Sequence, residues 1–211
     1  SPGFADMEPD LTIVLIGNSG VGKSASGNTI LGQKVFESRL AFNPVTKQIT
    51  PGTCAPVFGK RISVVDTPGI LDTKDTEAEI SAYCQELLQS NRPCLVSEAD
   101  IKLFELLPKL FGTDASKYTM VLFTHGDELR GQSIDQKVKN SRSMSELVSM
   151  CGGRYCVFDN NQRGNTQQVR NLLNKVDEMV TESGGTHCTS EMFSYTFIHC
   201  RKSRQRQIRV K

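Results

Sequence analysis

The 211-residue sequence contains no run of about 18 or more apolar residues, the length that a membrane-spanning helix needs. It also lacks, near its start, the charged, apolar and small-residue segments of a secretory signal. We therefore expect neither a transmembrane helix nor export, and we predict a soluble, cytoplasmic protein. Residues 1–6, which precede Met7, are interpreted as a cloning remnant and play no part in the fold prediction.

The seven cysteines include no C-x-x-C pair. An odd number of cysteines without that spacing is typical of neither a disulfide framework nor a zinc site. We expect buried or free thiols in a reducing compartment.

Acidic residues are absent from positions 201–211, although six basic residues lie there. The whole chain has a net charge of +2, so the remainder is net acidic, and it shows no basic stripe that would indicate nucleic-acid binding. We predict no nucleic-acid partner. The tail is either a solvated terminus or a weak, peripheral contact with the anionic surface of an intracellular membrane.

A glycine-rich loop follows the first apolar run of the chain. Residues 11–16 are typical of a strand, residues 17–24 match the pattern G-x4-G-K-S/T, and residues 25–31 are typical of a helix. In such a loop, backbone N–H groups face phosphate oxygens, the lysine reaches the β and γ phosphates, and the hydroxyl binds Mg²⁺. An accidental glycine turn is the alternative, and the strand and helix on either side argue against it. The predicted phosphate contacts are Asn18, Ser19, Gly20, Val21, Gly22, Lys23, Ser24 and Ala25.

A second apolar strand, residues 61–66, ends in Asp66 and is followed by Thr67-Pro68-Gly69. An aspartate at the end of a strand beside a phosphate loop can hold Mg²⁺ through a water molecule, and the Gly69 N–H can bind a γ-phosphate. Losing that phosphate removes the contact. We therefore predict that the segment after Gly69 is ordered with a triphosphate and looser with a diphosphate.

A further switch segment is expected between residues 36 and 50. A triphosphate switch needs a mobile hydroxyl that completes the Mg²⁺ shell and touches the γ-phosphate, and we assign this role to Thr46. The alternative is that Thr46 only begins an edge strand, because threonine favours strands. Lys23, Thr46 and Gly69 form the predicted catalytic set. The predicted metal ligands are Ser24, Thr46 and Asp66.

The base is predicted from the strand at residues 120–124 and the residues after it. Thr124, His125 and Asp127 lie at its carboxyl end. A carboxylate there can accept from both the N1–H and the 2-amino group of guanine, a donor pair that adenine lacks. The histidine ring can lie against the base, although an inert surface histidine is the alternative. The loop at Asn160, after the strand at 155–158, can present a backbone N–H to guanine O6.

Strand and helix patterns alternate along the chain, which predicts a mostly parallel sheet with helices on both faces and a ligand edge at the carboxyl ends of the strands. The predicted strands are 11–16, 61–66, 120–124 and 155–158, with an edge strand within 46–59. The predicted helices are 77–89, 100–111, 135–150 and 167–181.

The motifs together resemble the GIMAP family, the GTPases of immunity-associated proteins, and particularly its fish-type members. The shared segments are 17–32, 45–47, 66–69, 117–129, 151–155 and 184–187. The resemblance implies a Ras-like G domain, an α/β P-loop NTPase fold with a six-stranded sheet. It further implies GTP or GDP with Mg²⁺, and nucleotide-dependent formation of a homodimer or larger oligomer. The domain is expected to span residues 7–185, with a C-terminal extension at 186–211.

Two features depart from that family. A central strand buried on both faces should show five or six apolar residues, and an arginine-bearing box should follow it; residues 92–100 are too short for either. Either the strand is truncated or residues are absent from the chain, and we favour the absence. Second, residues 193–198 alternate like a strand, where the family continues into a charged helix.

Catalysis is predicted to be weak. Efficient hydrolysis needs an oriented water and a neutralising charge, commonly a glutamine and an arginine, but Ile70 follows Gly69. Our hypothesis is a guanine-nucleotide switch that hydrolyses slowly. The alternatives are a nucleotide-binding scaffold with negligible turnover and an ATP-using P-loop enzyme, which Asp127 argues against.

Overall fold

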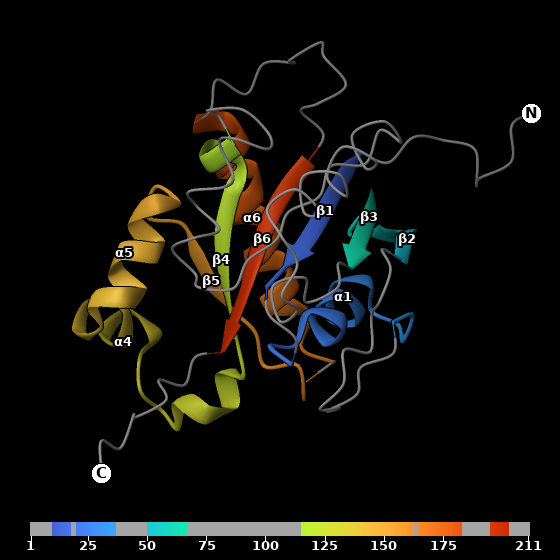
Figure 1. Cartoon of the computed structure of the whole chain (residues 1–211). Coiled ribbons are helices and arrows are strands. Elements are labelled where there is room, and N and C mark those ends of the chain that lie inside the picture. The colour runs from blue at the N-terminus through green and yellow to red at the C-terminus, as the bar shows by residue number, and fades with distance from the viewer. Residues whose placement is uncertain are drawn as a thin grey trace, which may run out of the picture.

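The computed structural model describes residues 10–17, 20–36, 50–66, 115–162, 164–182 and 195–202. Within these ranges, six strands form one sheet in the order β2-β3-β1-β6-β4-β5 (Figure 1). All neighbouring strands are parallel except β2 and β3, which form an antiparallel hairpin. The strands are β1 (Leu11–Ile16), β2 (Thr50–Val57), β3 (Lys60–Asp66), β4 (Thr119–Thr124), β5 (Tyr155–Val157) and β6 (Tyr195–Lys202).

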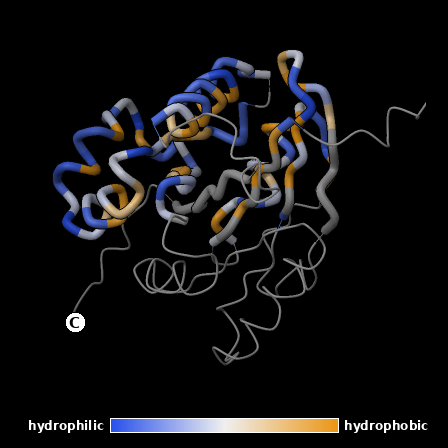
Figure 2. Tube along the Cα trace, turned by 90° about the horizontal axis from the view of Figure 1, so that it is seen from above, coloured by the Kyte–Doolittle hydropathy of each residue, from blue (hydrophilic) through white to orange (hydrophobic). Residues whose placement is uncertain are grey.

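Helices cover both faces of this sheet. The longer helices are α1 (Lys23–Leu31), α4 (Ile134–Asn140), α5 (Arg142–Met150) and α6 (Thr166–Glu182), and two short 3₁₀ turns, η3 (Ala115–Tyr118) and η4 (Gly126–Leu129), flank β4. Apolar residues of α1 and α6 share one buried cluster with alternate residues of β1, β3 and β4. On the opposite face, α5 packs against β4. The hydrophobic residues gather between these layers (Figure 2).

Alternation along the strands explains the two-sided core. Met120 and Leu122 join the α1 and α6 cluster, whereas the ring of Phe123 meets that of Tyr155 edge-on, with centroids 6.1 Å apart. Successive side chains of a strand point to opposite faces, so a strand buried on both sides is mostly apolar. All six residues of β4 are buried, and the four between Thr119 and Thr124 are apolar.

The predicted strands at 11–16, 61–66, 120–124 and 155–158 are confirmed to within a residue or two, and the edge strand expected within 46–59 is β2. The predicted helix at 167–181 is α6. The predicted helices at 77–89 and 100–111, and the short apolar run at 92–100, lie outside the described residues.

The single helix predicted over 135–150 is wrong, because two helices meet at Ser141. The backbone of Ser141 is extended, with φ −114° and ψ 112°, and its hydroxyl accepts a hydrogen bond from the Met144 N–H. This is a helix N-cap, which gives the polar side chain a better partner than a helix interior does. The chain therefore starts a new helix there.

The central position of the sheet is taken by a strand from the end of the chain. β6 pairs with β1 on one side and with β4 on the other, both in parallel. Residues 193–198 were expected to alternate like a strand, and β6 begins at Tyr195. The extension predicted at 186–211 therefore contributes a strand to the sheet itself, although the expected domain limit at residue 185 stays a prediction.

The tip of the β2–β3 hairpin is fastened to α6. The guanidinium of Arg170 lies 4.1 Å from the centre of the Phe58 ring, and Lys60 Nζ lies 2.7 Å from Asp177 Oδ1. The two partners of the ion pair are about half-exposed, so that pair adds little stability. The contacts nevertheless set where the hairpin, and thus Asp66 at its far end, lies relative to the helices.

We predict that Ser141→Ala lowers the free energy of unfolding by about 1 kcal/mol, because α5 loses its N-cap. Ser141→Asp should keep most of the stability, since a carboxylate caps equally well. Urea denaturation of the three proteins measures the difference. Equal midpoints for the alanine variant and the unchanged protein would show that α4 and α5 do not need this cap.

Candidate phosphate and base site

The lysine side chain at the start of α1 bonds back to the residue that follows β1. Lys23 is 6% exposed, and its Nζ donates a 2.7 Å hydrogen bond to the Gly17 carbonyl oxygen. Gly22 has φ +95°, a conformation that residues with a side chain rarely adopt. The Gly17 carbonyl thus holds the Lys23 ammonium group at the start of α1, where the helix N-terminus adds a partial positive charge.

Ser24 and Asp66 meet beside this lysine. The Ser24 Oγ donates to Asp66 Oδ2 over 2.5 Å, although the residues are 42 positions apart, and Asp66 is 1% exposed. The parallel pairing of β1 with β3 brings them together, because Leu15 lies opposite Asp66 in the register. One hydroxyl and one carboxylate oxygen are ligands that suit Mg²⁺, which takes few protein ligands and completes its shell with phosphate and water.

The described residues contain no group of three or more His, Cys, Asp or Glu side chains that could hold a metal ion alone. The two oxygens of Ser24 and Asp66 would therefore hold Mg²⁺ together with nucleotide phosphates rather than in a closed protein cage. The chemistry of this donor set fits the metal predicted from the sequence.

The carboxyl end of β4 is bonded directly to the phosphate loop. Thr124 is fully buried, and its hydroxyl donates a 2.5 Å hydrogen bond to the Val21 carbonyl oxygen. The same hydroxyl lies 3.0 Å from Nδ1 of His125. Thr124 was predicted as a base-side residue, and its position shows a second task, which is to join the base side to the phosphate side.

The two predicted base loops also bond to one another. The Phe158 N–H donates to the Phe123 carbonyl over 2.8 Å, and the Gly126 N–H donates to the Phe158 carbonyl over 2.9 Å. A Cβ added to Gly126 would lie 3.1 Å from the Phe158 carbonyl oxygen. Glycine at this position therefore permits the close approach of the loops that carry Asp127 and Asn160.

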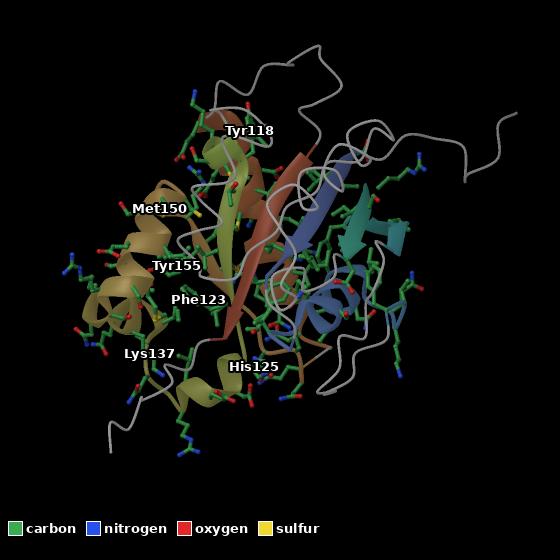
Figure 3. All side chains as sticks on the ribbon, viewed as in Figure 1. Tyr118, Phe123, His125, Lys137, Met150 and Tyr155 are labelled. Carbon is green, nitrogen blue, oxygen red and sulfur yellow. The ribbon has the colours of Figure 1, made fainter. Side chains whose placement is uncertain are left out.

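Asp127 and His125 lie at the same edge of the sheet as the phosphate loop. Asp127 is exposed in η4, where its carboxylate is open to solvent, and His125 is partly buried. His125 has a left-handed backbone, with φ 59°, and immediately precedes η4. In Figure 3 it lies at the end of β4, away from Phe123 and Tyr155. These positions suit contact with a base that approaches from solvent.

The side chain of Asn160, as well as its loop, holds this residue at the site. Its amide is hydrogen-bonded to two residues of α1, with Thr29 donating to Oδ1 over 2.8 Å and Nδ2 donating to Ser26 Oγ over 3.1 Å. The amide is therefore engaged by the protein. The backbone of its loop remains the part suited to the predicted contact with guanine O6.

The structure gathers the described members of the predicted site at one edge of the sheet. These are Gly20, Val21, Gly22, Lys23, Ser24, Ala25, Asp66, Thr124, His125, Asp127 and Asn160. Asn18, Ser19, Thr46 and Gly69 lie outside the described residues, so their predicted roles stay predictions.

Sequence reasoning missed Asn28, which fixes the chain after α1. Its side chain is 2% exposed and makes three 2.8 Å hydrogen bonds, accepting from the N–H groups of Val35 and Phe36 and donating to the Phe36 carbonyl. Asparagine is unfavourable inside a helix. Its presence within a predicted helix was therefore the sequence signal that could have indicated such a role. The bonds set the point from which the chain leaves toward residue 46.

Basic residues also reach this edge from the end of the chain. In the register of β6 with β4, Arg201 lies opposite Phe123 and Lys202 opposite Thr124. The last residue of β6 paired with β1 is His199, opposite Ile16, so Arg201 and Lys202 extend past the end of β1. The basic tail predicted from the sequence thus leaves the sheet at the same edge as the phosphate loop.

Two of the cysteines, Cys151 and Cys156, are not among the predicted site residues. Cys151 and Cys156 are buried and free, as expected for thiols outside a disulfide framework. Burial raises the pKa of the Cys151 thiol to about 12, and the nearby Arg154 offsets only part of that effect. The Cys151 thiol is therefore protonated and unreactive at neutral pH.

None of the helices in the described ranges is both long enough and apolar enough to cross a membrane.

Over residues 11–207 the chain matches the AIG1 family. It is 37% identical to GTPase IMAP family member 8 of Homo sapiens over 192 residues, which are 82% of this chain and 29% of that protein. It is 30% identical to immune-associated nucleotide-binding protein 9 of Arabidopsis thaliana over 207 residues, 90% of this chain and 60% of that protein. The chain thus spans less than two thirds of the length of these relatives.

Solved structures share the fold. Toc33 of Arabidopsis thaliana, in complex with GDP and Mg²⁺, superposes with a TM-score of 0.53 at 16% identity, covering 82% of this chain and 84% of that one. A structure from work on the chloroplast translocon components atToc33 and psToc159, for whose GTPase activity dimerization is important, gives a TM-score of 0.58 at 17% identity, covering 81% of this chain and 83% of that one. The predicted α/β P-loop G-domain fold is confirmed.

We predict that Asn28→Ala lowers the free energy of unfolding by about 2–4 kcal/mol, because the buried N–H and carbonyl of Phe36 and the part-buried N–H of Val35 lose their partner. Asn174→Ala, the same change at an exposed position of α6, should shift stability by less than about 0.5 kcal/mol. Urea denaturation compares them. Equal effects of the two substitutions would show that the hydrogen bonds of Asn28 contribute nothing to stability.

Proposed function

The chain belongs to the AIG1 family, and on that premise we propose that it is a guanine-nucleotide switch. In this proposal it binds GTP and GDP with Mg²⁺, hydrolyses GTP slowly and associates with itself through the G domain according to the nucleotide bound. One observation carries the proposal: the buried Lys23 ammonium, the Ser24 hydroxyl and the Asp66 carboxylate converge at one helix N-terminus. That combination places a cation for a polyphosphate next to two oxygen ligands for its metal ion.

Lys23 would leave the Gly17 carbonyl and bind the β and γ phosphates, because a charged phosphate oxygen is a stronger acceptor than a neutral carbonyl. Mg²⁺, when bound, neutralises charge on those phosphates. Ser24 and Asp66 would hold it, and Thr46 would complete its shell in the triphosphate state. The Gly69 N–H would donate a hydrogen bond to the γ-phosphate and would lose this bond in the diphosphate state.

Guanine would be chosen by the Asp127 carboxylate. Its position in η4 is supported by the bond between Gly126 and Phe158, and its exposure leaves both oxygens open to the N1–H and 2-amino donors. His125 would lie against the base, and the backbone at Asn160 would meet guanine O6. A donor pair satisfied by one carboxylate gives strong discrimination against adenine, which would leave that carboxylate unpaired.

Hydrolysis would be slow on the isolated chain. Ile70 stands where a water-orienting glutamine is common, and no arginine-bearing box is apparent between residues 70 and 115. Self-association would supply what one copy lacks, as dimerization is important for the GTPase activity of atToc33 and psToc159. A scaffold that binds nucleotide with negligible turnover is the second candidate, favoured by the same lack of catalytic groups.

We also propose that the protein acts in the cytoplasm, with its basic tail making at most a weak contact with anionic intracellular membranes. The support is the charge of residues 201–211, which carry six basic and no acidic side chains. Each basic residue near such a surface adds about 1 kcal/mol of attraction, which falls off within a Debye length.

Asp127→Asn is predicted to shift the preferred base from guanine to xanthine, because xanthine has a carbonyl where guanine has its 2-amino group. Nucleotide competition, with displacement of labelled GDP or xanthosine diphosphate, measures the change. Asp177→Asn removes the same charge on the exposed surface of α6 and should leave the preference unchanged. If ATP displaced bound GDP from the unchanged protein as well as unlabelled GDP does, the assignment of guanine would be overturned.

GTP turnover by the dilute monomer is predicted to be far slower than about one per second, and the rate per molecule should rise with protein concentration. Phosphate release over a concentration series, together with sedimentation in GDP and in a non-hydrolysable GTP analogue, measures both effects. Turnover near one per second at low concentration would contradict the missing catalytic groups. Absence of phosphate release in a single turnover would favour the scaffold.

A further inference from the structure

Two buried hydroxyl groups of α1 have no role in the binding of phosphate or Mg²⁺ proposed above. Ser26 is fully buried and Thr29 is 3% exposed, and both lie beyond Ser24 along the helix. Both are hydrogen-bonded to the side-chain amide of Asn160, which is 134 and 131 positions away. We call these three residues the amide clamp. It connects the helix that begins at the phosphate loop to the loop predicted to meet the base.

The clamp engages both ends of the amide. The Thr29 hydroxyl has one proton and two acceptors within reach, the Ala25 carbonyl at 3.0 Å and Asn160 Oδ1 at 2.8 Å. In the reverse orientation of the amide, Thr29 would donate to Ala25 and accept from Nδ2, while Ser26 would donate to Oδ1. Either orientation bonds the amide at both ends to α1.

Side chains from two helices support this loop, and the clamp is one of these supports. On the other side, Gln168 of α6 accepts from the Asp159 N–H over 3.0 Å and donates to the Asp159 carbonyl over 3.1 Å. The loop therefore sits between α1 and α6, bonded to each by a side-chain amide. The bonds of the clamp lead to α1, the helix that carries the phosphate site.

Packing at Gly22 shows how closely the two sides meet. A Cβ placed on Gly22 would lie 3.6 Å from Asn160 Nδ2 and 3.5 Å from the Thr124 side chain. The backbone of the phosphate loop thus lies in direct reach of the clamp. A nucleotide has a set distance between base and phosphates, so the two halves of its site must be held at that spacing before it binds.

We propose that Thr29 and Ser26 are positioning residues for guanine recognition, which act through Asn160 to hold the base loop at a set distance from the phosphate loop. This inference rests on the proposed function, because it concerns the affinity for a guanine nucleotide. It predicts that breaking the clamp weakens binding of a nucleotide that uses both halves and spares one that uses only the phosphate half.

Thr29→Val tests this, because valine keeps the shape of threonine and removes the hydroxyl. The dissociation constants of GDP and ADP, measured by calorimetry with Mg²⁺ present, are expected to diverge: that of GDP should rise about tenfold, the effect of one lost hydrogen bond, and that of ADP should stay the same. The preference for guanine would shrink by the same factor. Thr29→Ser should restore it, and Ser26→Ala is a second, independent break.

Thr181→Val is the matched control, since Thr181 on α6 donates to the carbonyl four residues earlier, as Thr29 can, and is far from the loop. It should change neither constant. Equal weakening of GDP and ADP by Thr29→Val would overturn the inference and assign the clamp a purely structural role in α1. An unchanged protein that does not prefer GDP over ADP would instead overturn the proposed function.

Discussion

The hydrogen bond from Thr124 to the Val21 carbonyl is the contact on which the arrangement of the site depends. It joins the end of β4 to the phosphate loop across 103 positions of sequence, over 2.5 Å. Bonds from Phe158 and Gly126 then fix the second base loop to the first, and the amide of Asn160 ties that loop to α1. The separation of the phosphate and base halves follows from this chain of direct contacts.

Polar groups perform two different tasks at this edge of the sheet. Some face solvent and are available to a ligand, as Asp127 is. Others are buried and fully occupied by the protein, as Asn28, Thr29 and Thr124 are. Burying a polar group without a partner costs about 1–3 kcal/mol. The buried residues therefore favour the one arrangement of the loops in which all of them are hydrogen-bonded. The base loops held by these bonds therefore need little ordering when a ligand binds.

The phosphate loop and its strand and helix could be predicted because their signals are local. The pattern of residues 17–24 needs glycines and a lysine at set spacings along one segment, and the neighbouring periodicities follow from each residue's own preferences. The meeting of Ser24 with Asp66 could be predicted too, because parallel strands bring their carboxyl ends to one edge. The division at Ser141 could not, since a serine serves equally as an exposed helix residue or as a cap until neighbouring contacts decide.

By itself, then, the sequence determined a phosphate-binding type of loop, the carboxylate that is predicted to meet a base, and an α/β sheet with one ligand edge. Tertiary structure alone decided that Tyr195–Lys202 is the central strand between β1 and β4, and that the Asn160 amide faces α1. The physical reason is the same in both cases. Strand pairing and buried hydrogen bonds depend on which distant segments compete for the same position, and no local preference encodes that competition.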